Sequence, residues 1–266
     1  VHKVDTDHDG DLDYTARMRG WHQHWDWGLI EYHIHRFSLT RMVDDDADGI
    51  LEWKHKTIHM SNATDWDFDQ HLEQRESYTA TLVWWDANED GYEEHVFRRV
   101  KETSYFDQHA NGWNNQNEEI RSMEVWRNSL SQPRVIRVMV AELTSWDNNS
   151  DGNPDTYSYL ARTWQATDTD FDGFLDRRVF HRHYMTAKDD NADGNVNYAL
   201  NSNIWHARNL SLSSTGTIDT LQEAYLSHRV FEWNINQQGH AYHTNSTRVG
   251  VHVDYVAGTS QAITLT

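Results

Sequence analysis

The stretch DTDFDGFLDRRVFHRHYMTAKDDNADGNVN occupies residues 168–197 and contains one acidic loop written twice. The first copy, DTDFDGFLD, begins at Asp168, and the second, DDNADGNVN, begins at Asp189, 21 residues later. The residues between the two copies include neither Gly nor Pro, and they contain Val, Phe, Tyr and Thr, which favour β-strands. The stretch therefore predicts one long strand, of roughly 40 Å at the usual rise per residue, between two loops of the same kind.

The same nine-residue loop recurs along the chain. Three copies start at residues 44, 65 and 86, and three more at residues 147, 168 and 189, so both series step by 21; another copy starts at residue 5. A degenerate copy, DQHANGWNN, starts at Asp107, and weaker echoes end in Gly28, Pro133, Gly216 and Gly239. About 11–12 such units cover the chain, which predicts a single repeat-array domain over residues 1–266.

The segments between loops set the expected fold class. Residues 53–64, 74–85, 95–106 and 177–188 all have strand composition and no internal turn signal. Consecutive strands joined by a short loop must run antiparallel. We expect an all-β protein, an antiparallel meander of about 11–12 strands with a ~21-residue repeat, forming a shell, a barrel-like sheet or an open ribbon. Paired helices around the loops are disfavoured, because the segments lack Ala and Leu and are too short for two helices and a linker.

The loop has the chemistry of a hard-cation site. Ca²⁺ takes six to eight oxygen ligands, and an EF-hand supplies them from loop positions 1, 3, 5 and 7, with Gly at position 6 for the sharp turn. In the loop at 168 these ligands would be Asp168, Asp170, Asp172 and the carbonyl of Phe174, with Asp176 at position 9 closing the site. An EF-hand has its closing Glu at position 12, whereas position 12 here is Val179.

The same positions in the seven loops give the predicted metal ligands. These are Asp5, Asp7, Asp9, Asp13, Asp44, Asp46, Asp48, Glu52, Asp65, Asp67, Asp69, Glu73, Asp86, Asn88, Asp90, Glu94, Asp147, Asn149, Asp151, Asp155, Asp168, Asp170, Asp172, Asp176, Asp189, Asn191, Asp193 and Asn197. The predicted cofactor is Ca²⁺, at about seven sites. Seven such ions would bring the formal charge from −19 to −5, and without them the clustered carboxylates would repel one another.

The DxDxDGxxD pattern resembles the calcium loops of FG-GAP integrin-type repeats, dockerins and thrombospondin type 3 repeats. The spacing departs from FG-GAP units, which are about three times longer. The whole chain is most similar to secreted bacterial and archaeal proteins built of tandem DxDxDG repeats. That resemblance implies an extracellular structure stabilised by calcium, with no shared catalytic activity.

Composition excludes several classes of partner and scaffold. A net charge of −19 disfavours nucleic acid, which needs a basic patch. No apolar run is long enough to predict a membrane span, and the absence of Cys excludes a disulfide framework. Extracellular calcium modules bind at roughly 10⁻⁴ to 10⁻³ M, so the loops favour an extracellular or cell-surface location, although no signal peptide is visible.

Three His-x-His pairs form a second candidate metal motif: His22/His24, His33/His35 and His181/His183. Residues i and i+2 share one face of a strand, so each pair could hold Zn²⁺ or Cu²⁺. No third ligand is evident from the sequence, and histidines stacked on a polar sheet face are the favoured interpretation.

Other features bear on surfaces and partners. Aromatic pairs such as Trp84-Trp85, Tyr105-Phe106 and Trp25/Trp27 precede loops, and they predict aromatic ladders or a glycan-stacking platform. Four N-glycosylation sequons start at Asn62, Asn148, Asn209 and Asn245. The chain starts with VHKV and ends with SQAITLT, which predict short terminal strands and head-to-tail pairing of subunits.

Together these features predict an extracellular structural protein that self-associates as a subunit of a filament, sheath or surface layer. An adhesin or glycan-binding module is the alternative. An enzyme is not expected, because the loop carboxylates are assigned to metal and no nucleophile motif is present.

Overall fold

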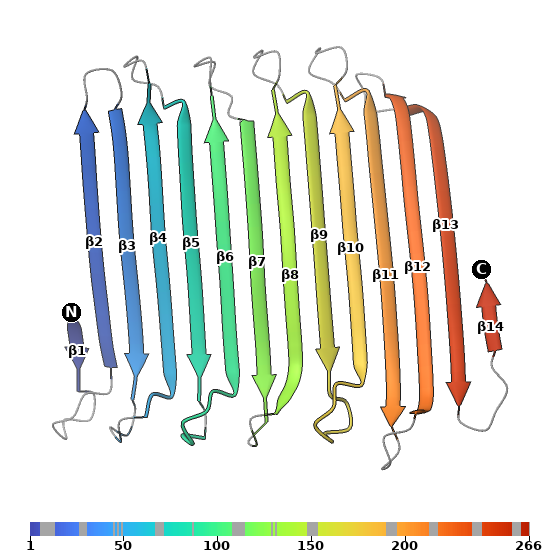
Figure 1. The fold of residues 1–266 in the computed structure, drawn as a ribbon, viewed down its shortest axis with the longest axis horizontal. Helices are drawn as coiled ribbons and strands as arrows, with labels where there is room; N and C mark the ends of the chain where they lie inside the picture. The colour runs from blue at the N-terminus through green and yellow to red at the C-terminus, as the bar shows by residue number, and fades with distance from the viewer. Residues whose placement is uncertain are drawn as a thin grey trace. The chain divides into compact units, whose positions relative to one another are not determined.

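The computed structural model describes residues 1–5, 14–26, 31–44, 46, 48, 50–66, 72–86, 88–107, 115–128, 130, 132–147, 154–189, 196–212, 218–235, 241–256 and 262–265. All secondary-structure elements in these ranges are β-strands (Figure 1). Within these ranges no helix has the length and apolar character needed to cross a membrane.

The contacts within the chain divide it into two compact units, Val1–Pro133 and Arg134–Thr266. Unit 1 contains β1 (His2–Val4), β2 (Tyr14–Asp26), β3 (Glu31–Val43), β4 (Trp53–Asp65), β5 (Gln74–Trp85), β6 (His95–Phe106) and β7 (Asn115–Arg127). Unit 2 contains β8 (Pro133–Trp146), β9 (Thr156–Thr167), β10 (Arg177–Lys188), β11 (Tyr198–Leu212), β12 (Ile218–Ile235), β13 (Ala241–Val256) and β14 (Ala262–Leu265).

In each unit every strand pairs antiparallel with the next strand along the chain. The predicted all-β meander is therefore confirmed, and β10 has the bounds expected from the opening stretch. In the described residues of each unit the first and last strands do not pair with each other, so each unit is an open sheet and not a closed one.

The sheets have almost no hydrophobic core. Among the described residues only Val125, Ala166 and Leu200 are buried apolar side chains. In β10 every residue from Val179 to Ala187 is half-buried, with no alternation between a buried and an exposed face. A sheet packed on a core shows such an alternation, so neither face of β10 has the pattern of a face packed on a core.

A row of aromatic rings lies just inside the loops at one end of unit 1. Trp53, Trp85, His95 and Trp126 are successive cross-strand partners on β4 to β7. The rings of His95 and Trp126 stack with centroids 3.8 Å apart. Such directly opposed pairs stabilise a sheet that lacks a core, so the predicted aromatic ladder is present here.

Both outer strands are long and only partly covered. The short β1 pairs with Tyr14–Ala16 alone, and β14 pairs with Val251–Asp254 alone. On their outer sides, residues 17–26 of β2 and 241–250 of β13 have no strand partner among the described residues. Each unit therefore presents one open edge of unpaired backbone groups.

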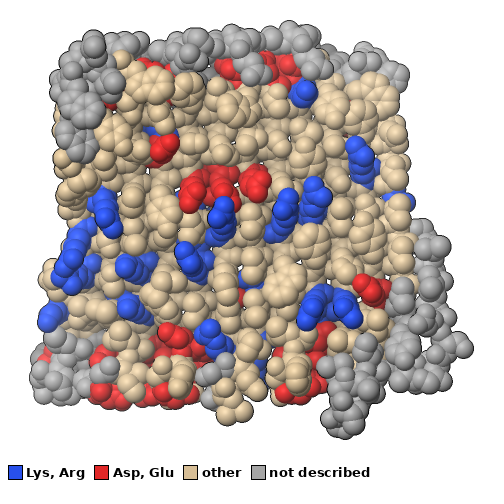
Figure 2. Space-filling model, viewed as in Figure 1, with Lys and Arg blue, Asp and Glu red and all other residues tan. Residues whose placement is uncertain are grey.

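Charge is separated along the strands. On the face shown in Figure 2, Asp and Glu gather mostly at the strand ends, where the loops lie, and most Lys and Arg lie along the middle of the strands. Acid is thus concentrated where the sequence predicts metal sites.

Candidate metal centres

The buried acids of the described structure all belong to the predicted loops. Seven carboxylates are buried, with relative exposures of 2–8%: Asp65, Glu73, Asp86, Asp147, Asp168, Asp176 and Asp189. Each occupies position 1 or position 9 of a loop, the two points at which the chain leaves one strand and enters the next. Burying a carboxylate costs free energy unless hydrogen bonds or a cation compensate, so these positions require partners.

Part of that compensation comes from the loop backbone. Asp168 Oδ1 accepts a hydrogen bond from the Phe171 amide at 2.7 Å, and Oδ2 accepts one from the Gly173 amide at 3.0 Å. Asp86 Oδ2 accepts from the Gly91 amide at the same 3.0 Å. The first aspartate thus holds the turn closed in the same way in both loops.

Positions 3 and 5 repeat a second pattern. The position 5 carboxylate accepts from the position 7 amide in three loops, at 2.7 Å for Asp48, 2.9 Å for Asp90 and 2.8 Å for Asp172. Asp46, Asn88 and Asp170 at position 3 accept from the position 5 amide at 3.1–3.3 Å. These turns curl the loop so that its side-chain oxygens converge.

Position 9 closes the loop from the other side. Asp176 Oδ2 accepts from the Thr169 amide at 2.8 Å and from the Thr169 hydroxyl at 2.9 Å. Glu73 Oε2 accepts from the equivalent amide of Trp66 at 2.5 Å. Asp and Glu therefore serve the same closing role, as the sequence pattern predicts.

The curl requires left-handed backbone at two positions. Gly91 and Gly173 at position 6 have φ of 84° and 93°, as expected for the loop glycine. Glu89 and Phe171 at position 4 are also left-handed, with φ of 59° and 67°. No sequence signal marks position 4, because residues with side chains adopt this conformation only when the surroundings impose it.

Three loops bring ligand atoms within 4.8 Å of one another. The groups are Asp44, Asp46, Asp48 and Glu52; Asp86, Asp90 and Glu94; and Asp168, Asp170 and Asp176. Asp172 is outside its group. The amide of Asn88 donates to Asp90 at 3.2 Å. The other predicted Asp and Glu ligands of these three loops converge, and the three clusters could each hold a metal ion.

Two orphaned oxygens fit a cation in the clusters. Oδ1 of Asp44 and Oδ1 of Asp86 are buried and have no hydrogen-bond partner. Both belong to position 1 and to the converging groups. A buried carboxylate oxygen that accepts no hydrogen bond from the protein is expected where that oxygen binds a metal ion. An all-oxygen set of ligands suits a hard cation.

Crowded charge acts on the acids at the loop tips. Burial, together with Asp176, Asp172 and Asp168, raises the pKa of Asp170, against a lowering by the Asp172 amide. The pKa of Glu89 is raised first by Asp46, then by burial and further acids of both loops. Glu89 belongs to the loop at 86 and Asp46 to the loop at 44, so neighbouring loops share one electrostatic environment.

Backbone hydrogen bonds also connect loops that lie at the same end of the strands, and they do so at both ends. The Asp86 amide donates to the Glu52 carbonyl at 2.9 Å, and the Asp107 amide donates to the Glu73 carbonyl at 2.8 Å. In unit 2 the Asp189 amide donates to the Asp155 carbonyl at 2.9 Å. The first residue of one loop is thereby tied to the last residue of the loop two strands earlier.

The remaining predicted ligands are described in part or not at all. Asp7, Asp9, Asp13, Asp67, Asp69, Asn149, Asp151, Asn191 and Asp193 lie outside the described residues. Asp5, Asp65, Glu73, Asp147, Asp155, Asp189 and Asn197 are described and flank those segments. Metal sites in the loops at 5, 65, 147 and 189 stay predictions.

The structure contains a further convergent group of possible metal ligands that the sequence did not predict. His24, Glu31 and His33 each place a ligand atom within 4.8 Å of the others. The three belong to β2 and β3, where His24 and His33 are direct cross-strand partners. The sequence shows the His-x-His pairs, but it does not indicate that Glu31 lies beside them. The third pair, His181/His183 on β10, is opposed by Trp205 and Asn203 and belongs to no such group among the described residues.

The glycosylation sequons fall mostly within strands. Asn62, Asn209 and Asn245 lie in β4, β11 and β13, whereas Asn148 lies outside the described residues. The Asn62 amide already donates to Glu76 at 3.0 Å. Acceptor asparagines are expected in surface loops, so glycosylation stays a prediction.

Comparison with known proteins adds no family to this description. No family model matches the chain, and no curated protein or solved structure matches it either.

Proposed function

We propose that this chain is an extracellular structural protein whose fold is completed by Ca²⁺ and which self-associates as a subunit of a filament, sheath or surface layer. The observation that carries the proposal is an inversion of normal burial. The described residues include three buried apolar side chains but seven buried carboxylates, all at repeat-loop positions. A protein whose buried side chains are mainly carboxylates depends on cations for its stability, whereas other proteins depend on a hydrophobic core.

Calcium is the cation that suits the loops best. The clusters offer carboxylate oxygens, and the loop backbone supplies the turn at position 6. Mg²⁺ demands a stricter octahedral arrangement and sheds its water reluctantly, whereas Ca²⁺ accepts irregular oxygen cages. Because loops of this type bind at roughly 10⁻⁴ to 10⁻³ M in extracellular modules, an external location with millimolar calcium follows.

Self-association is supported by the open edges and faces. The outer side of β2 from residue 17 to 26 has no described strand partner, and this stretch includes the exposed side chains of Met18 (65%) and Trp21 (50%). Long exposed edges template pairing with another chain unless charge or Pro blocks them. Large apolar side chains are exposed on inner strands too, for example Met60 and Trp205, which suits sheets covered by further copies.

The experiment is negative-stain electron microscopy of the purified chain in millimolar Ca²⁺ and again after addition of EGTA. We expect fibres or sheets that disassemble with EGTA. The double variant M18K/W21K places charge on the open β2 edge and should shorten or abolish the polymers. The matched control M60K places the same charge on an inner strand and should leave edge pairing intact. Dispersed particles in both conditions would refute the structural proposal.

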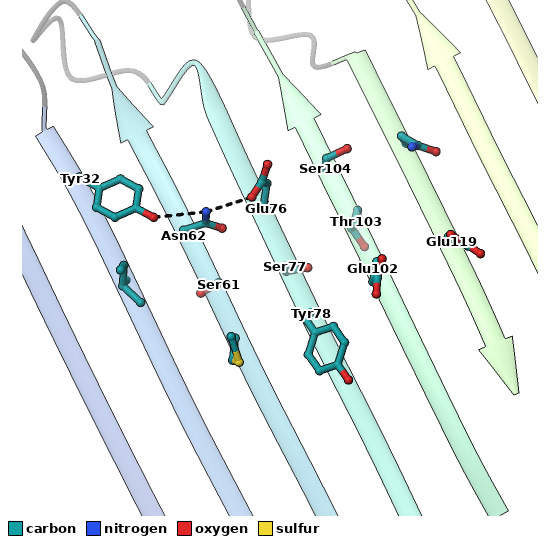
Figure 3. Close-up of a pocket in the computed structure, with 13 residues that line it drawn as sticks. Tyr32, Ser61, Asn62, Glu76, Ser77, Tyr78, Glu102, Thr103, Ser104 and Glu119 are labelled. Carbon is teal, nitrogen blue, oxygen red and sulfur yellow. Dashed lines mark hydrogen bonds between the residues drawn. The ribbon is translucent and has the colours of Figure 1, made fainter.

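A second candidate, glycan binding, is favoured by one hollow in unit 1. The hollow has a volume of about 470 Å³ and lies over β3 to β7 (Figure 3). Tyr32 and Tyr78 line it, together with Glu76, Glu102 and Asn62. Aromatic rings beside fixed polar groups suit a sugar, whose faces are apolar and whose rim is polar.

Glycan-array binding of the calcium-loaded chain tests this candidate. A specific glycan should lose affinity in Y78A and retain it in Y184A, which removes a tyrosine of β10 outside the hollow. Equal binding by both variants would remove the hollow from consideration.

A further inference from the structure

We propose that the β2–β3 hairpin binds one divalent transition-metal ion of the Zn²⁺ class through Nε2 of His24, Nε2 of His33 and the carboxylate of Glu31. This site differs from the acidic loops in its ligands and does not depend on the proposed calcium role. The site is also expected to prefer an ion that binds nitrogen ligands, a preference that is not expected of the acidic loops.

The three ligand atoms already converge. Oε1 of Glu31 lies 2.8 Å from Nε2 of His24 and 3.0 Å from Nε2 of His33. In a tetrahedral zinc site with bonds of about 2.0 to 2.1 Å, ligand atoms lie about 3.3 Å apart. A cation at the centre of the group therefore requires only small side-chain shifts.

Strand register explains why these residues meet. His24 and His33 are cross-strand partners, and Glu31 is two residues before His33 on the same strand. Positions i and i+2 point to the same face, so all three side chains share one face of the hairpin. The imidazole rings of His24 and His33 are nearly parallel, with an interplanar angle of 2° and centroids 4.5 Å apart.

A second histidine pair extends the site along the hairpin. His22 and His35 are also direct partners, and their rings stack with centroids 4.1 Å apart. Beside them, a hollow of about 310 Å³ is lined by His33, His35 and Arg75. The four imidazoles form one ladder, and Glu31 at its end selects His24 and His33 as the pair with a carboxylate.

Charge on the neighbouring strand also favours a cation. Glu31 is the cross-strand partner of Asp65 on β4, and the side chain of Asp65 is only 2% exposed. Like charges directly opposite each other destabilise a sheet, so a metal ion on Glu31 would ease this repulsion wherever the loop at 65 holds no calcium. The three proposed ligands remain 30–44% exposed, so solvent can supply the remaining coordination, as it does in open zinc sites.

The chain contains a matched control for this proposal. His181 and His183 on β10 have the same His-x-His spacing, but Trp205, Asn203, Thr163 and Ala161 oppose them, and no carboxylate of the described residues forms a group with them. The histidine motif alone is thus present in one place, and the motif with a carboxylate in another.

The test is isothermal titration calorimetry of the full chain with Zn²⁺ in about 10 mM Ca²⁺, roughly ten-fold or more above the dissociation constants expected for the acidic loops, so that the loops are largely occupied. We expect one Zn²⁺ per chain in the wild type and in H181Q/H183Q. The double variant H24Q/H33Q should lose this binding, and E31Q should weaken it by about ten-fold or more. Titration with Co²⁺ should give visible absorption bands of a nitrogen-containing site in the wild type and none in H24Q/H33Q.

Three results would overturn the assignment. The first is Zn²⁺ binding that is unchanged in both E31Q and H24Q/H33Q. The second is an equal loss in H181Q/H183Q, and the third is a loss in H22Q/H35Q with H24Q/H33Q unaffected. Circular dichroism in Ca²⁺ checks the fold of each variant, and if H24Q/H33Q is not folded, the single-residue E31Q titration decides.

Discussion

The connection at Asn128–Gln132 and the loop at 168–176 solve the same structural problem with different residues. Asn128 Oδ1 accepts hydrogen bonds from the amides of Leu130 and Gln132, at 3.0 and 2.9 Å. Asp168 accepts from the amides of Phe171 and Gly173 at 2.7 and 3.0 Å. In both connections the side chain of the first residue closes the turn on backbone amides.

The difference lies in what the acidic loop adds. One neutral amide suffices to close the connection at 128, so closure does not explain the further carboxylates of Asp170, Asp172 and Asp176. Those groups crowd together, and burial and mutual repulsion raise the pKa of Asp170. The comparison teaches that one side-chain acceptor can close a turn, whereas the repeat loop supplies four acidic side chains whose surplus charge a cation could compensate.

Removal of Ca²⁺ should have the largest effect, because it should destabilise the loop at 168–176 and leave the connection at Asn128–Gln132 unchanged. With Ca²⁺ ten-fold above its dissociation constant, each site stabilises the fold by about 1.4 kcal/mol, so EGTA should lower the melting temperature markedly. Hydrogen exchange measured by mass spectrometry should show loss of protection at Gly173 and Phe174 and retention at Leu130 and Gln132. An equal loss of protection at both places would mean that Ca²⁺ does not stabilise the acidic loop specifically.

The double variant D170N/D176N should remove one ion while preserving the turn, because each of these carboxylates accepts its hydrogen bonds with a single oxygen. Each Asn keeps an acceptor oxygen for the loop amides but no longer carries charge. We expect one Ca²⁺ fewer by equilibrium dialysis and a loss of about 1–2 kcal/mol in calcium. In EGTA the variant should be as stable as the wild type or more stable, because repulsion is reduced. Lower stability in EGTA as well would show that the carboxylates have a structural role without metal.

Asn128 offers the converse test. N128A removes the acceptor of two amides and should cost about 1–2 kcal/mol, measured by urea unfolding. Because no metal is involved, the loss should be the same with Ca²⁺ and with EGTA. A calcium-dependent loss would place a metal ion at this connection too.

Backbone strain should give the smallest effect. Gly91 has a φ of 84° and nothing within 4 Å of an added Cβ, so G91A tests conformation alone. The expected loss is about 1 kcal/mol. Gly20, in the middle of β2, meets only the Arg36 carbonyl at 3.9 Å, and G20A should be neutral or slightly stabilising. Equal thermal stability of the two variants would contradict the left-handed loop geometry.

Much of the fold could be predicted because the acidic loops mark the ends of strands from β3 to β11 at a regular interval. The segment 177–188 has the bounds of β10, and seven of the described position 1 and position 9 acids are buried, as expected for the predicted ligands. Whether the sheet closes could not be predicted, because closure depends on strand twist, which residues half-buried on both faces do not encode.

The group of His24, Glu31 and His33 shows where sequence reasoning stopped short. The connection between β2 and β3 has lost the acidic motif, so nothing in the sequence indicated how those two strands pair. A shift of one residue in register would turn the partner side chain to the opposite face. Position 4 of the loops was missed for a related reason, since Glu89 and Phe171 carry no chemical mark of a left-handed backbone.

The backbone bond from the Asp86 amide to the Glu52 carbonyl has a consequence for how ions load the sheet. It sets the loops at 44 and 86 side by side at one end of the strands, two strand spacings apart, or roughly 9 to 10 Å. The loop at 65 lies at the other end of β4, roughly 40 Å away. Since the screening length in physiological salt is about 8 Å, the first ion bound at one end weakens the field that attracts its neighbour there. The field of this ion does not reach the loops at the opposite end of the strands. Ions should therefore bind with graded affinity along each end of the strands, and the two ends should titrate as independent series.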